Sequence, residues 1–212
     1  MNLILPNPHA DRAIIDSMSS TNSKPRILDA ALALIKKRGG ADVSMAEIAK
    51  AARVSRQAVY LHFADRADLM LALVAHVDEK RGLADELRKI AEAPTGVAAM
   101  FEMAAVQARS NPGIWAIASA LDAVRRTDAD AERGWQDRLK HRWEGCRRIV
   151  ERVKKEGALK AGLGDEAATD LLWSITSLRM WEDLVLERKW TAAQYEERIT
   201  RLLRDALTNV KG

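Results

Sequence analysis

Two short helix patterns meet in residues 44–63, SMAEIAKAARVSRQAVYLHF, across a short break. Ser44 stands three residues before Glu47, so the serine hydroxyl can accept a hydrogen bond from the Glu47 amide while the Glu47 carboxylate accepts one from the Ser44 amide. Ser55 is placed to cap a second helix. Two short capped helices with so tight a connection predict a helix-turn-helix unit.

The second of these helices has one apolar side and one polar side. At about 100° per residue, Val59 and Phe63 fall on the same side, while Gln57 and Leu61 point the opposite way. No carboxylate occurs from residue 56 to residue 62. A surface without acidic groups suits a helix that lies against phosphate, so we expect this segment to bind DNA.

The segment resembles the N-terminal domain of the tetracycline-repressor (TetR) family of bacterial transcription regulators. The residues that carry the resemblance are Ser44, Ile48, Ala49, Val54, Ser55, Val59, Tyr60, His62, Phe63, Arg66 and Leu69. The family usually has glycine in the turn where this chain has Arg53, and lysine where it has Arg66. Because a left-handed backbone is costly for residues other than glycine, we expect a strain of about 1 kcal/mol at Arg53.

If the second helix lies in the major groove, its outer side meets the base edges. We expect Arg56 to bind guanine, Gln57 to bind adenine, and Ala58 and Leu61 to lie against thymine methyl groups. The residues expected to hold the DNA backbone are Ser44, Lys50, Ser55, Tyr60, His62 and Arg66. In the alternative interpretation, residues 60–62 only cover the surface of a packed helix.

The positive charge of the chain is concentrated in this region. Residues 24–60 contain eight basic and three acidic side chains, a net charge of +5, whereas the whole chain of 212 residues carries +4. The remaining residues therefore nearly balance, which favours a nucleic-acid-binding surface in the N-terminal part.

The periodicity predicts an all-α protein of about nine helices in two parts. We expect a flexible arm in residues 1–23, a three-helix DNA-binding domain in residues 24–70, and a helical regulatory and dimerisation domain in residues 71–212. Within the last of these, turn residues predict helices near residues 97–110, 112–126, 130–156 and 165–188, and a final helix capped by Thr191.

Signatures of catalysis are missing from the sequence. It contains no phosphate-binding loop, no dinucleotide-binding glycine motif, no HExxH and no CxxC, so we expect no enzyme activity, cofactor or metal. The single cysteine, Cys146, cannot form an internal disulfide, which fits a reducing cytoplasm. No apolar run approaches the roughly 20 residues needed to cross a membrane.

The resemblance implies a small-molecule site in the C-terminal part, where all six tryptophans lie. The candidate lining, suited to an apolar or aromatic effector, is Phe101, Met103, Trp115, Ile117, Trp143, Trp173 and Met180. The alternative is that these side chains are ordinary core, which is the commoner role of aromatic residues and methionines at helical spacing.

One helix-turn-helix covers too few base pairs to specify a site, so we expect a homodimer on an inverted repeat. The candidate interface on the last two helices is Trp173, Ser177, Met180, Leu184, Ile199, Leu202, Leu203 and Ala206, which would form a four-helix bundle with a second copy. The alternative is that these stripes pack only within one chain.

The sequence as a whole predicts a repressor released from its operator by a ligand. Other interpretations are an effector-independent activator or architectural protein and, more distantly, a helical enzyme or scaffold.

Overall fold

The computed structural model describes residues 23–38 and 43–210, in which all regular structure is helical. The expected arm therefore lies outside the described residues, apart from Ser23. The N-terminal helices are α2 (Ser23–Lys37), α3 (Met45–Ala52), α4 (Arg56–His62) and α5 (Arg66–Lys80). The remaining elements are α6 (Leu83–Glu92), α7 (Gly96–Arg125), α8 (Ala129–Lys155), α9 (Asp165–Ile175), α10 (Leu178–Trp181), the π-helix η1 (Glu182–Glu187) and α11 (Ala192–Leu207). The prediction of an all-α fold is confirmed, with ten α-helices in the described residues instead of about nine.

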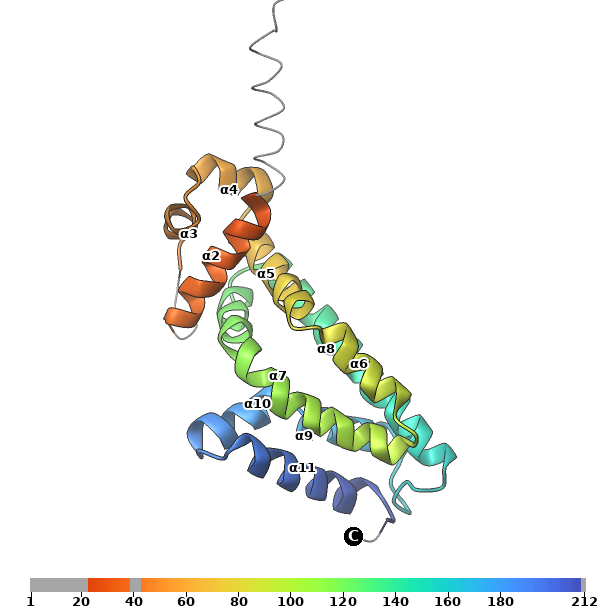
Figure 1. Ribbon diagram of the computed structural model, residues 1–212. Helices are drawn as coiled ribbons and strands as arrows, with labels where there is room; N and C mark the ends of the chain where they lie inside the picture. The colour runs from red at the N-terminus through yellow and green to blue at the C-terminus, as the bar shows by residue number, and fades with distance from the viewer. Residues whose placement is uncertain (1–22, 39–42, 211–212) are drawn as a thin grey trace, which may run out of the picture.

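Helices α2–α4 form one end of an elongated molecule and α11 lies at the other end (Figure 1). Helix α5 leads from this first unit into the body formed by α6–α11. It runs across residue 70, where the sequence suggested a domain boundary.

The molecule has two apolar cores. The first is formed by α2–α5 together with the second half of α7 and the start of α8, including Ile27, Val59 and Leu121. The second is formed by α6, the first half of α7, and α8–α11, including Met100 and Tyr195. Because α7 contributes to both cores, the N-terminal unit is packed onto the body and is not connected to it by α5 alone.

The predicted break at residues 111–113 was wrong, because α7 continues through Pro112 as a single helix. A proline inside a helix removes one backbone hydrogen bond and costs about 3 kcal/mol or more. Here both halves of the helix bury apolar side chains, Ala104 in the second core and Ile117 in the first, and this burial offsets the cost. Figure 1 shows that α7 bends along its length.

The predicted single helix over residues 165–188 was also wrong. Helix α9 ends at Ile175, where the Thr176 hydroxyl donates to the Leu172 carbonyl oxygen at 2.7 Å. Ser177 then caps α10 by accepting from the Met180 amide at 3.1 Å. Hydroxyl side chains that bond nearby backbone groups favour helix ends, which explains the interruption.

Candidate nucleic-acid interface and effector site

The turn between α3 and α4 has a left-handed residue at the position where the family usually has glycine. Arg53 has φ 56° and ψ 45°. Its amide donates to the Lys50 carbonyl at 3.2 Å, and the Val54 amide donates to the Ala49 carbonyl at 3.0 Å. Arg26 on α2 donates to the Ala52 carbonyl at 2.9 Å. These bonds satisfy the free carbonyl groups at the end of α3 and hold the turn in place.

The start of α3 has the reciprocal cap that the sequence predicted. The Glu47 amide donates to the Ser44 hydroxyl at 3.3 Å, and the Ser44 amide donates to Glu47 Oε2 at 2.9 Å. Arg38, at the end of α2, donates to Glu47 Oε1 at 2.5 Å. The Arg38 guanidinium and the two Ser44 donors lower the pKa of Glu47 to about 2.

Helix α4 presents to solvent the side that the periodicity predicted. Val59 and Phe63 are 0% and 1% exposed, whereas Tyr60 is 43% and Leu61 79% exposed. Gln57 is also exposed. Ser55 caps this helix by accepting from the Ala58 amide at 3.0 Å.

Two of the polar side chains on α4 already have partners. Arg56 donates to the Tyr60 hydroxyl at 3.4 Å, and its guanidinium carbon lies 5.6 Å from the centre of the Tyr60 ring. His62 Nε2 lies 2.5 Å from the hydroxyl of Ser23 on α2, so this ring is turned partly toward the protein. Of the other predicted DNA contacts, Lys50 is exposed on α3 and Arg66, the first residue of α5, is partly buried.

Ion pairs connect α5 to the neighbouring helices α2 and α8. Asp29 on α2 lies 2.8 Å from His76 Nε2 and 2.5 Å from Lys80 Nζ, and these two bonds lower the pKa of Asp29. On the other side, Arg138 of α8 donates to Asp78 at 2.8 Å. Helix α5 is therefore held by both the N-terminal unit and the body.

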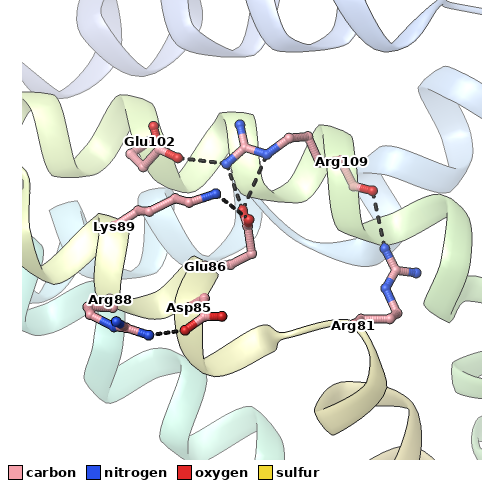
Figure 2. A network of polar contacts seen from close by, with 7 residues as sticks. All are labelled: Arg81, Asp85, Glu86, Arg88, Lys89, Glu102 and Arg109. Carbon is pink, nitrogen blue, oxygen red and sulfur yellow. Dashed lines mark hydrogen bonds and ion pairs between the residues drawn. The ribbon is translucent and has the colours of Figure 1, made fainter.

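A further polar network, which the sequence did not predict, lies where α5, α6 and α7 meet (Figure 2). Arg81 donates to the Arg109 carbonyl at 3.2 Å. The Arg109 guanidinium binds Glu86 at 2.7 Å and Glu102 at 2.6 Å. The Arg81 guanidinium also passes over Gly113, where a Cβ would lie 1.4 Å from Arg81 Nη1. The only sequence signal for this contact is a glycine next to a proline inside a helix.

The candidate effector residues are distributed over several places. Phe101, Met103, Trp115, Trp173 and Met180 all belong to, or pack against, the second core. Ile117 belongs to the first core, so the structure does not bring it together with the others.

Trp143 and Trp173 line a surface groove of about 470 Å³ between α8 and α9. The Trp143 indole nitrogen donates to Asp170 across this groove at 2.8 Å. Of the candidate effector residues that line this groove, Trp173 also packs against the second core and Trp143 does not.

The candidate interface residues divide into two groups. Ile199 and Leu203 are 1% and 0% exposed and pack inside one chain, so they are not available to a partner. Leu202 is 41% exposed, and a second exposed apolar side chain, Leu171 on α9, lies outside the predicted set. The partly exposed members are Trp173, Ser177, Met180, Leu184 and Ala206.

In the described residues, no group of three or more histidine, cysteine, aspartate or glutamate side chains is placed to hold a metal ion. Among the helices of the same residues, none is both long and apolar enough to cross a membrane.

The N-terminal part of the chain is similar to known transcription regulators. Residues 27–73 match the family model of the bacterial regulatory proteins, tetR family. The HTH-type transcriptional regulator AcrR of Shigella flexneri is 49% identical over 47 residues, which are 22% of each chain. Residues 27–73 are therefore similar to the DNA-binding domain of TetR-family regulators.

Over a longer stretch of the chain, the similarity to known relatives is lower. The nucleoid occlusion factor SlmA of Marinomonas sp. (strain MWYL1) is 27% identical over 155 residues, 69% of this chain and 73% of that one. A protein from Saccharomonospora viridis, described as a transcriptional regulator and solved in complex with choline, has a TM-score of 0.75 at 13% identity, covering 90% of this chain and 100% of its own. This likeness extends the shared fold to the whole body.

Proposed function

We propose that this protein is a cytoplasmic transcription repressor of the TetR family. As a dimer it binds an inverted repeat in double-stranded DNA, and a small molecule bound in the body releases it. The observation that carries the proposal is the outer side of α4, where Gln57, Tyr60 and Leu61 face solvent while Val59 and Phe63 fix the helix to its unit. A capped helix with a polar, acid-free side suits the major groove.

The proposed base contacts are those of the exposed α4 side chains. Gln57 can pair with adenine through its amide, and Leu61 can pack against a thymine methyl group. Arg56 can bind guanine once it leaves Tyr60, whose hydroxyl then becomes free for a phosphate oxygen. Because His62 lies against Ser23, we propose that it mainly positions α4 against α2.

The proposed phosphate contacts surround this helix. Ser44 and Ser55 lie at the starts of α3 and α4, where amide groups and the helix dipole favour an anion. Lys50 extends from the exposed side of α3, and Arg66 begins α5. These contacts hold the backbone and place α4 in register without selecting a sequence.

We propose that α9 and α11 form the dimer interface, centred on Leu171 and Leu202. Both are large apolar side chains left exposed by the fold of one chain. Such exposure on neighbouring helices indicates an interaction surface when the patch is contiguous. We propose 24–70 as the DNA-binding domain and 71–212 as the regulatory and dimerisation domain, with α5 as the shared helix.

A ligand in the body acts through α5 in this proposal. Asp78 connects α5 to α8, and Arg81 at the end of α5 connects it to α7. Lys80 connects α5 to α2. A ligand that shifts α7 or α8 therefore moves the N-terminal units of a dimer relative to each other. It must prefer the released arrangement by several kcal/mol to change the bound fraction from mostly bound to mostly free.

Binding to the DNA that flanks the protein's own coding region tests the proposal. We expect a fragment with an inverted repeat to bind as a dimer, with an affinity that falls linearly on a log scale as salt rises. Unlabelled fragment should compete far better than a scrambled one, because specific sites typically bind about 10³-fold or more tighter than random DNA. Equal competition by scrambled DNA would contradict a sequence-specific repressor.

Release from the same DNA fragment by a panel of compounds tests a second candidate function, an effector-independent architectural protein. The similarity to SlmA, a protein named as a nucleoid occlusion factor, over most of both chains motivates the architectural part of this candidate. It predicts that no compound in a broad panel releases the protein from DNA. A compound that binds saturably and releases the protein from DNA would support the ligand-controlled repressor.

A further inference from the structure

A cation without a counter-ion reaches into the body. Arg142 extends from α8 to the carboxyl end of α9, where its Nη2 donates to the Trp173 carbonyl oxygen and, at 3.2 Å, to the Thr176 hydroxyl. Its guanidinium carbon lies 5.1 Å from the centre of the Trp173 ring. Among residues 23–38 and 43–210, no carboxylate pairs with Arg142, and its Nε and Nη1 make no hydrogen bond.

The groups nearest to this charge are neutral. Cys146, one turn along α8, is 0% exposed, and burial raises the pKa of its thiol to about 11. Tyr195 on α11 is also 0% exposed, and burial raises the pKa of its hydroxyl to about 12. Burial lowers the pKa of Arg142, yet an arginine side chain remains protonated in proteins. Within the described residues, the charge of the partly exposed Arg142 is therefore met by the Trp173 carbonyl, the Thr176 hydroxyl and the Trp173 ring, and by no carboxylate.

Several hydrogen-bond donors of the body are buried without a partner. Besides the Asn111 amide nitrogen on α7, they are the Tyr195 hydroxyl and the indole nitrogens of Trp115, Trp173 and Trp181. Tyr195 and the three tryptophans belong to, or pack against, the second core. Indole nitrogens can only donate, and a buried donor without an acceptor costs about 1–3 kcal/mol. The Trp173 ring lies against the Arg142 guanidinium and the Tyr195 hydroxyl interacts with its charge, so one acceptor-rich anion at this point can satisfy both donors.

We propose that the body binds a small organic anion, whose acidic group lies against Arg142 and the Tyr195 hydroxyl and whose apolar part lies near Met103, Trp173 and Trp181. This inference rests on the proposed function, for which it names the chemical class of the effector. A guanidinium with two unused nitrogens can bind a carboxylate or a similar acidic group through paired charge-assisted hydrogen bonds. Met103 is suited to the apolar part, because its sulfur already lies 3.9 Å from Cys146 Sγ and 3.6 Å from Thr176 Oγ1, beside the guanidinium.

The position of Arg142 also connects the site with the DNA-binding unit. Arg138, one turn earlier on α8, pairs with Asp78 of α5 at 2.8 Å. Farther along the same helix, a Cβ on Gly134 would lie 2.4 Å from Leu71 of α5. An anion that draws α8, α9 and α11 together therefore acts on α8, which is in direct contact with α5.

A matched pair of fluorescent probes tests this inference on the full-length protein. Anilinonaphthalene sulfonate is an anion, and phenylnaphthylamine has the same rings without the sulfonate. We expect saturable binding of the sulfonate, about one per chain, and about tenfold tighter than binding of the neutral probe, a ratio equivalent to 1.4 kcal/mol. Arg142→Met should remove this preference while changing the affinity for the neutral probe less than about threefold.

Two further variants separate ligand binding from folding. Tyr195→Phe keeps the ring and removes the hydroxyl, so we expect a several-fold loss for the sulfonate alone, and this variant carries the test if Arg142→Met does not fold. Arg147→Met is the control, because Arg147 is exposed on the same helix and pairs with Glu151 at 3.5 Å. It should behave like the unaltered protein.

Three results would overturn the inference: equal affinities for the two probes, a preference that survives Arg142→Met and Tyr195→Phe, or no saturable sulfonate binding. DNA binding is measured in parallel without either probe. A protein that binds its DNA normally and lacks the preference contradicts the anion site alone. Loss of specific DNA binding contradicts the proposed function and leaves the probe result interpretable.

Discussion

Gly96 at the start of α7 lies directly against the backbone of Val153 on α8. A Cβ at position 96 would lie 2.4 Å from the Val153 amide nitrogen. The same end of α7 is bound through the Gly96 amide, which donates to the two carboxylate oxygens of Glu156 at 2.7 and 2.9 Å. Arg152 donates to the carbonyl of Ala93 just before this helix, at 2.5 Å. The close approach of two backbones therefore fixes the corner of the body at which α7 begins.

Gly96→Ala should destabilise the protein by about 1–3 kcal/mol, because a methyl group would force the two backbones apart. Urea unfolding followed by circular dichroism measures this change. Gly145→Ala is the control, since position 145 lies inside α8 and the nearest atom to an added Cβ is 3.9 Å away. Alanine there should stabilise the helix by about 0.5–1 kcal/mol. Similar effects of the two substitutions would contradict the close approach.

Arg53→Gly should stabilise the DNA-binding unit by about 1 kcal/mol, because φ at this position is +56°. Glycine adopts this conformation without a steric penalty. Arg53→Ala removes the same side chain but keeps the strain, so its unfolding midpoint should stay near that of the unaltered protein. If alanine stabilised the protein as much as glycine does, the gain would come from loss of charge and not from relief of strain.

The DNA-binding unit could be predicted from the sequence because its signals are local. Ser44 and Ser55 cap the helices that follow them within three residues, and the apolar period of α4 places Val59 inside and Leu61 outside. Each of these features depends on residues that lie within two helical turns of each other. The tertiary contacts of this unit do not override these local signals.

The body could be predicted less well because its features depend on distant contacts. Pro112 suggests a helix end locally, but burial of Ile117 in the first core and Ala104 in the second keeps α7 continuous. The stripe of α11 that suggested a dimer interface has Ile199 and Leu203 buried within the chain. An apolar stripe predicts that a helix face is covered, but not whether the cover is the same chain or a partner.

Acid should weaken the N-terminal unit through Glu47. The pKa of Glu47 is about 2 in the folded protein, against 4.5 for a free glutamate side chain. A carboxyl group whose folded pKa is lowered stabilises the fold above its unfolded pKa, and this contribution is lost as the pH falls through the folded value. The loss should therefore occur between about pH 4.5 and pH 2.

Glu47→Gln tests this assignment by chemical denaturation at several pH values. The variant should be less stable than the unaltered protein at neutral pH, and the difference should shrink as the pH falls to 2. Glu196→Gln on the exposed side of α11 provides a control for loss of one carboxylate. A constant difference across this pH range would show that Glu47 does not supply the titrating cap.

Gln57→Ala should weaken binding to the cognate DNA by about 1–3 kcal/mol and leave binding to unrelated DNA nearly unchanged, because Gln57 is proposed to read a base. Lys50→Ala should weaken both by a similar factor and lower the salt dependence, because Lys50 is proposed to contact phosphate. Fluorescence anisotropy with labelled cognate and scrambled duplexes compares them. A loss at Gln57 that is equal on both duplexes would contradict base recognition by this side chain.

Leu202→Asp should separate the proposed dimer without unfolding the chain. Leu202 is 41% exposed in one chain, so a carboxylate there disturbs only a partner that covers it. Ile199→Ala, one turn earlier on α11, removes a side chain that is 1% exposed and should cost about 2–5 kcal/mol of stability within each chain. Sedimentation velocity at micromolar concentration should show monomers for Leu202→Asp, with helix content preserved. If the unaltered protein is itself monomeric, or if Leu202→Asp remains dimeric, the interface proposed on α9 and α11 is wrong.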